Sequence, residues 1–94
     1  MKIHIDQGHR LLAACDKELL GNEYKEGELR LKVSKGFYHD EEVDEETLLR
    51  FLKTVTTANL VGERVVNVAV KAGFIDEGSV LKIDGIPHAQ MFTV

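Results

Sequence analysis

Apolar residues in the middle of the chain recur at the spacing of an amphipathic helix. The first repeat follows i, i+3, i+4, i+7 and consists of Leu48, Phe51, Leu52 and Val55. Asp44 precedes it as a candidate N-cap, and two glutamates follow in the first turn, where negative charge suits the helix dipole. The pattern predicts a helix that begins at Glu45 and ends near Ala58.

A second apolar repeat follows directly and leaves only a thin polar stripe, which is typical of a mostly buried helix. Its main stripe consists of Val65, Val68, Ala69 and Ala72. Asn59 is the predicted N-cap, and Gly73 is a suitable C-cap because glycine tolerates the left-handed conformation. The β-branched residues over 65–70 leave a strand as the alternative, but the length and the glycine stop favour a helix.

The remainder reads as short strands and turns. Alternation of apolar and polar residues predicts strands over 2–6, 11–15 and 29–34, the first two as a hairpin. Asp84-Gly85 predicts a hairpin turn between strands at 80–83 and from Ile86 onward. Pro87 lacks an N–H, so this last strand is expected at an edge or irregular near its start. Asp16 is a candidate cap for one helical turn over 17–20. We expect loops over 22–27 and at Phe37 and Tyr38.

These elements predict one α+β domain over 1–94. In it, a small, mainly antiparallel sheet of about five short strands is covered by two consecutive helices. Ninety-four residues, 44% of them hydrophobic, suffice for a single small core. We expect no membrane span, because no stretch approaches the roughly 18 to 20 apolar residues that one needs. We also expect no signal peptide. The single Cys15 fits a reducing cytoplasm.

The net charge of −4 argues against a protein that coats nucleic acid by charge alone. However, six of the sixteen acidic residues lie in the run 40–46. Outside that run the chain has 12 basic and 10 acidic side chains. A local basic surface is therefore compatible with the acidic total, and the run itself is expected to be a solvated helix start rather than a cation site.

Catalytic and metal signatures are weak. Cys15 could act as a thiol nucleophile beside a histidine, but a small core thiol is the more ordinary interpretation. The histidines at 4, 9, 39 and 88 are scattered, and cysteine and histidine do not cluster as zinc requires. We expect no metal, no cofactor and no catalytic residue, and we keep a small-molecule enzyme with Cys15 or His88 as the third alternative.

Two surface sets are candidates for binding. Cations on an alternating strand beside aromatic residues could grip phosphates while bases stack, which is the nucleic-acid-binding hypothesis. Its residues are Arg30, Lys32, Lys35, Tyr38 and Arg64. A predicted helix N-terminus beside an arginine could instead hold an anion or a ligand. Its residues are Asn59, Glu63, Arg64, His88 and Gln90.

Several short stretches, in this order, resemble the archaeal domain-of-unknown-function 424 family. They are 14–21 (ACDKELLG), 26–34 (EGELRLKVS), 37–38 (FY), 58–63 (ANLVGE) and 87–90 (PHAQ). The match covers nearly the whole chain. The resemblance implies a small archaeal cytosolic protein associated with translation, through RNA or the ribosome, and it supplies no catalytic residue.

The leading hypothesis is therefore a non-enzymatic module that binds RNA or a ribonucleoprotein. The alternative is a protein–protein adaptor or a homodimer. It would pair through the edge strand near the C-terminus or through an exposed part of the second helix.

Overall fold

The computed structural model describes residues 1–38 and 44–92. Its elements, in chain order, are β1 (Lys2–Asp6), β2 (His9–Cys15), η1 (Lys17–Leu19), β3 (Glu23–Glu26), β4 (Leu29–Lys32), α1 (Lys35–Tyr38), α2 (Glu45–Leu52), β5 (Thr57–Val61), α3 (Glu63–Lys71), η2 (Glu77–Ser79), β6 (Leu81–Ile83) and β7 (Ile86–Phe92). This is a mixed α+β fold, as the sequence pattern predicts.

Five strands form the main sheet in the order β1-β2-β5-β7-β6. β2 and β5 run parallel, and every other neighbouring pair in this sheet is antiparallel. β3 and β4 form a separate two-stranded hairpin. The sheet is therefore mainly antiparallel, with β5 in its centre and β1 and β6 at its edges.

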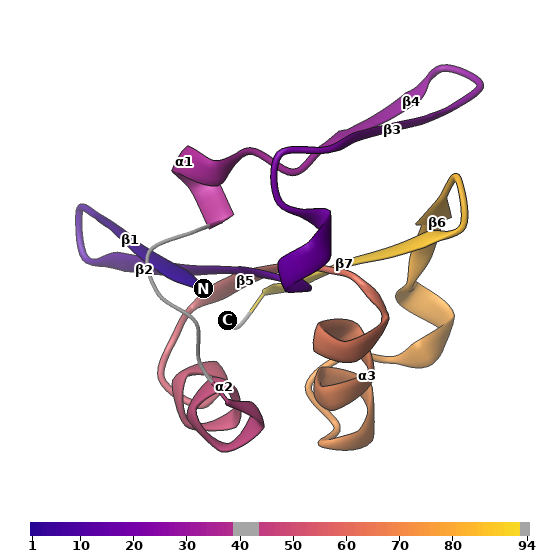
Figure 1. Ribbon diagram of the computed structural model, residues 1–94. Helices are drawn as coiled ribbons and strands as arrows, with labels where there is room; N and C mark the ends of the chain where they lie inside the picture. The colour runs from indigo at the N-terminus through magenta and orange to yellow at the C-terminus, as the bar shows by residue number, and fades with distance from the viewer. Residues whose placement is uncertain (39–43, 93–94) are drawn as a thin grey trace.

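Helices α2 and α3 cover one face of the sheet (Figure 1). Their apolar stripes meet the inward residues of β2, β5 and β7. The buried members of this core include Leu12, Leu48, Leu52, Leu60, Val66, Ala69 and Met91. Asp44 caps α2 as predicted, because its carboxylate accepts a hydrogen bond from the Thr47 N–H at 2.8 Å.

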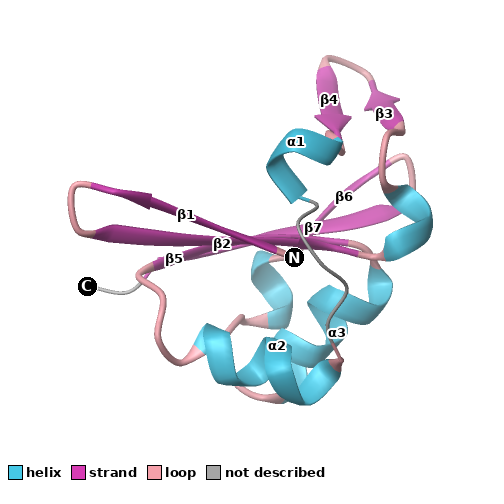
Figure 2. Cartoon of the chain, turned by 60° about the vertical axis from the view of Figure 1, so that its left-hand side comes forward, coloured by secondary structure: helices cyan, strands magenta, loops and turns pink. Residues whose placement is uncertain are grey.

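The opposite face carries α1, η1 and the β3–β4 hairpin (Figure 2). A smaller apolar cluster packs here, with Ala13, Leu31, Val33, Tyr38, Val61 and Ile83 buried. The two faces alternate along each strand, so Leu60 points to the helices while Val61 points to this second cluster. The helices thus lie on one face, and smaller elements cover the other only in part.

The central strand β5 was not predicted. The two helices were expected to be consecutive, with Asn59 capping the second, but residues 57–61 are a strand between them. Asn59 lies in the middle of that strand, so its prediction as a cap is wrong. α3 instead begins after Gly62. A short strand beside a helical repeat shows no clear period of its own, and its order comes from pairing with β2 and β7.

Three smaller predictions are also corrected. Residues 23–26 form β3 rather than a loop, because they pair with β4. Phe37 and Tyr38 end the short helix α1 rather than lying in a loop. β7 is an interior strand despite Pro87, because its ladder with β5 begins only at His88, one residue later.

The two predicted hairpin turns are confirmed. Gln7 and Gly8 have φ values of 49° and 83°, and Asp84 and Gly85 have values of 54° and 79°. Both pairs fit the left-handed two-residue turn that antiparallel strands favour. Among the described residues, no helix is long and apolar enough to cross a membrane. His39 and positions 40–43, which include the start of the acidic run, lie outside the described residues.

Candidate functional site

A polar network occupies the centre of the sheet face opposite α2 and α3. Its hub is Asn59, whose side-chain oxygen accepts a hydrogen bond from the Tyr38 hydroxyl at 2.8 Å. The same oxygen lies 2.9 Å from Nε2 of His88. An amide oxygen only accepts, so with this orientation His88 carries its proton on Nε2. The network joins α1, β5 and β7 through one side chain.

This network is uncharged at neutral pH. Burial raises the pKa of Tyr38 to about 12, and the nearby Cys15 adds to that shift. Burial lowers the pKa of His88 below its usual value of 6.5. The phenol therefore keeps its proton and the imidazole stays neutral. This arrangement is suited to fixing α1 on the sheet rather than to moving protons.

Cys15 and His88 do not form a nucleophilic pair. The strand register places Val61 between them, opposite Cys15 on one side and His88 on the other. Two strand spacings separate the side chains by about 10 Å, well beyond hydrogen-bond reach. Burial also raises the pKa of Cys15 to about 11, so the thiol is protonated at neutral pH. The geometry gives this pair no route to thiolate chemistry.

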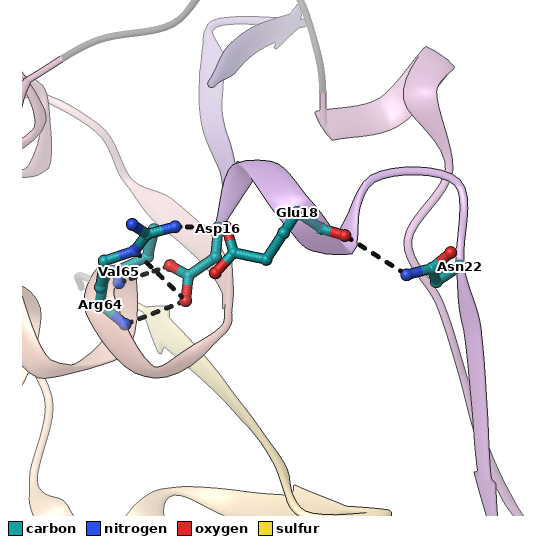
Figure 3. A network of polar contacts seen from close by, with 5 residues as sticks. All are labelled: Asp16, Glu18, Asn22, Arg64 and Val65. Atoms are coloured by element: carbon teal, nitrogen blue, oxygen red, sulfur yellow. Dashed lines mark hydrogen bonds and ion pairs between the residues drawn. The ribbon is translucent and has the colours of Figure 1, made fainter.

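The N-terminus of α3 is filled by a carboxylate of the same chain (Figure 3). Asp16 is buried, and its two side-chain oxygens accept the N–H groups of Arg64 at 3.1 Å and Val65 at 3.0 Å. Asp16 was predicted to cap the turn that follows it. That turn is present as η1, but the Asp16 side chain does not cap it and instead caps α3, 48 residues further along the chain.

Gly62 is required at this junction for two reasons. Its φ of +110° is a conformation that residues with a side chain rarely adopt. A Cβ built there would lie 2.4 Å from the Asp16 side chain. The guanidinium of Arg64 is also engaged, because it forms ion pairs with Asp16 and Glu18. An external anion would therefore meet a position already occupied by Asp16.

The predicted anion or ligand set is divided between two places. Asn59, His88 and Gln90 share the sheet face, where Gln90 is the register partner of Asn59. Glu63 and Arg64 lie at the start of α3. Asn59 is not at the helix N-terminus, so the set does not converge on one anion.

A basic surface lies on the outer face of the β3–β4 hairpin. The register places Lys25 opposite Arg30 and Glu23 opposite Lys32, while Tyr24 and Leu31 point to the core side. The Glu23 carboxylate lies 3.3 Å from Arg30 and 3.6 Å from Lys25. Three cations thus face one carboxylate on an arm that projects from the main sheet (Figure 1).

This basic hairpin contains only part of the predicted nucleic-acid set. Arg30 and Lys32 share it, whereas Lys35 begins α1 and Arg64 is on α3. Tyr38 is 4% exposed, so its ring cannot stack on a base as proposed. Lys25 was missed because residues 22–27 were interpreted as a loop. The register of β3 against β4 identifies it.

Exposed aromatic surface is found elsewhere on this side of the sheet. Phe92, at the end of β7, is 70% exposed and alternates with Met91, which points to the helices. Phe37 of α1 stacks on His4 of β1 with ring centroids 4.7 Å apart. Phe92 is thus an exposed aromatic residue on this side of the sheet, at the opposite end of β7 from Ile86, which packs against the cluster that contains Leu31.

A cavity of about 520 Å³ lies beside the end of β2, between α2 and α3. Cys15 and Tyr38 contribute to its lining, together with Leu48 of α2 and Asn67 and Lys71 of α3. Its size is within the range of small-molecule pockets. Within residues 1–38 and 44–92, no group of three potential metal ligands comes together.

Comparisons with known proteins agree with the resemblance seen in the sequence. A family model described as "Protein of unknown function (DUF424)" matches residues 3–94. The chain therefore belongs to the DUF424 family. A crystal structure of an uncharacterized conserved protein from Methanopyrus kandleri is similar, with 28% sequence identity and a TM-score of 0.83. The alignment covers 99% of this chain and 89% of that one. No curated protein matches the chain.

Proposed function

We propose that this DUF424 chain binds single-stranded RNA, free or in a ribonucleoprotein such as the ribosome, through its basic hairpin. The observation that carries the proposal is the gathering of Lys25, Arg30 and Lys32 on the outer face of a projecting two-stranded arm. Cations on such a surface can follow a phosphate backbone without reading sequence. A translation-linked role in the archaeal cytoplasm is part of the same proposal.

The distribution of charge supports this surface over others. Residues 23–32 carry three basic and three acidic side chains, but Glu26 and Glu28 lie off the outer face. On that face Glu23 offsets one of the three cations, so the face keeps a local positive excess although the whole chain has a net charge of −4. With three phosphate contacts, the logarithm of the binding constant should fall by about 2 for each tenfold rise in salt. We therefore expect weak binding. Stacking on Phe92 would add to it only for an RNA long enough to reach from the hairpin to the opposite end of β7.

The test is fluorescence anisotropy of a labelled oligouridylate of about 12 nucleotides across a salt series. The combined variant Lys25→Gln, Arg30→Gln and Lys32→Gln should lower affinity at low salt by at least tenfold and flatten the salt dependence. These side chains are exposed, so circular dichroism should show an intact fold.

A matched control removes the same charge from the helical side, by Arg50→Gln, Lys53→Gln and Lys71→Gln. All three side chains are exposed. The control should bind nearly as well as the parent chain. Equal losses in the two variants would mean that net charge alone drives binding, and the hairpin assignment would be wrong.

A further inference from the structure

The strand β1 is a free edge of the main sheet. In the described part of the chain its one ladder partner is β2, and it lies at the end of the strand order. Ile5 on this strand is 71% exposed. Edge strands usually carry a proline, a bulge or dense charge that blocks pairing with another chain. The sequence of β1, KIHID, has no proline, and its two charged residues stand at its ends, so nothing in the strand's own sequence blocks pairing with a further strand.

The turn that follows β1 decides which of its backbone groups face outward. Gln7 and Gly8 form a two-residue turn, so Asp6 and His9 flank it as a hydrogen-bonded pair. Pairs in an antiparallel ladder alternate between hydrogen-bonded and non-hydrogen-bonded. The backbone groups of Lys2 and His4 therefore point toward β2, and those of Ile3 and Ile5 point away from the sheet.

The sequence of β1 is complementary to its own reverse. Centred on His4, an antiparallel copy would place Lys2 opposite Asp6 at both ends. Ile3 would lie opposite Ile5, and His4 opposite its own copy. Opposite charges and apolar pairs at facing positions stabilise antiparallel strands.

Hydrogen bonding selects the same alignment. Centred on His4, the outward backbone groups of Ile3 meet those of Ile5 in the copy, so both can form a hydrogen-bonded pair. A shift of one residue would set Ile3 against His4, whose backbone groups face β2. The alignment that overlaps all five residues is thus the one in which charges, apolar side chains and backbone groups all match.

We propose that two copies of this chain pair antiparallel along β1 and form one continuous sheet across a two-fold axis at His4. The axis is perpendicular to the sheet, so α2 and α3 of both copies lie on one face and both basic hairpins lie on the other. The contact consumes the β1 edge of each copy and therefore closes as a dimer. This proposal does not depend on RNA binding.

The expected dimer is weak, because five residues from each copy bury less area than a standard interface. We expect a dissociation constant of roughly 10 to 1,000 µM. Sedimentation equilibrium from 10 µM to 2 mM of the full chain measures it. A strict monomer throughout that range would overturn the proposal.

The Ile5→Lys variant tests which edge is used. It places a charge beside Ile3 of the second copy and should weaken the dimer at least tenfold. Its matched control is Leu81→Lys on β6, the opposite edge, where the side chain is also exposed. The control should dimerise like the parent chain. If Leu81→Lys abolished the dimer and Ile5→Lys did not, the contact would lie on β6 and the proposal would be wrong.

Charge exchange tests the register. Lys2→Glu and Asp6→Lys each place like charges opposite one another in a homodimer, and each should raise the dissociation constant about tenfold. An equimolar mixture should restore association, because every facing pair then carries opposite charges. Lys2 also donates to the Gly36 carbonyl of its own chain at 2.9 Å. The Lys2→Glu variant could therefore lose dimer affinity because this internal hydrogen bond is broken. Mixing would not repair that loss, and a mixture no tighter than its components refutes the register.

Discussion

The two faces of the main sheet are built by different means. The face under α2 and α3 is closed by apolar side chains, with Leu12, Leu60 and Ala69 fully buried. The opposite face has the polar hub Asn59 in its centre and is only partly covered by α1 and the hairpin (Figure 2). β5 serves both faces. Burial of apolar surface thus holds the sheet to its helices, whereas directional hydrogen bonds set the position of α1.

The largest expected difference comes from removing the same side chain on each face. Leu60→Ala leaves a cavity at a site with 0% exposure in the central strand, and should lower the free energy of unfolding by about 2–5 kcal/mol. Leu31→Ala, on the core side of the hairpin, should cost about 2 kcal/mol, because the smaller cluster can settle around it. Urea unfolding of both variants measures the loss in the free energy of unfolding. A larger loss at Leu31 would reverse the assignment of stability to the helical face.

An intermediate effect is expected at the polar hub. Asn59→Ala leaves the Tyr38 hydroxyl and His88 Nε2 without their shared acceptor, and should cost about 1–3 kcal/mol. Tyr38→Phe removes one donor but leaves Asn59 bonded to His88, so its cost should be about 1 kcal/mol. Thermal unfolding compares the two variants. Equal costs would mean that the hydrogen bonds do not govern how α1 is held.

The smallest effect is a pH dependence confined to the polar face. Burial lowers the pKa of His88 in the folded chain, so below pH 6.5 the unfolded chain takes up a proton that the folded chain resists. Stability from this group is therefore complete above pH 6.5 and declines as the pH falls through the folded-state pKa. His88→Gln should remove this part of the acid sensitivity. Unfolding free energies of both chains at pH 7.5 and 5.5 give the difference, and an unchanged slope would contradict it.

Local sequence signals predicted those parts of the fold that local forces determine. The two hairpin turns and the Asp44 cap were identified because the residues that form them are neighbours in the chain. β5 and β3 were missed because pairing with distant or polar partners orders them. Asn59 resembled a helix cap, but the carboxylate that caps α3 comes from Asp16 at the end of another strand.

The candidate site shows the same division. Alternation along β4 correctly put Arg30 and Lys32 on one face, since a strand has a period of two. Lys25 required the register of a strand that was not expected. Tyr38 was taken for a surface ring because no local pattern reveals that α1 folds back onto the sheet and buries it. Arg64 pairs with Asp16 and Glu18, which are far from it in the sequence, so no local pattern could reveal that its charge is already neutralised.

The cap that Asp16 provides to α3 also constrains the order in which the chain can fold. The carboxylate reaches the first turn of α3 only when β2 and β5 lie side by side, and these strands are joined by a long intervening segment. A peptide limited to α3 would lack its cap and should form little helix in isolation. The hairpin β3–β4 can close early because its strands are adjacent, whereas α3 must wait for the slow, long-range closure of the parallel pair. Completion of this helix therefore reports that the centre of the sheet has assembled.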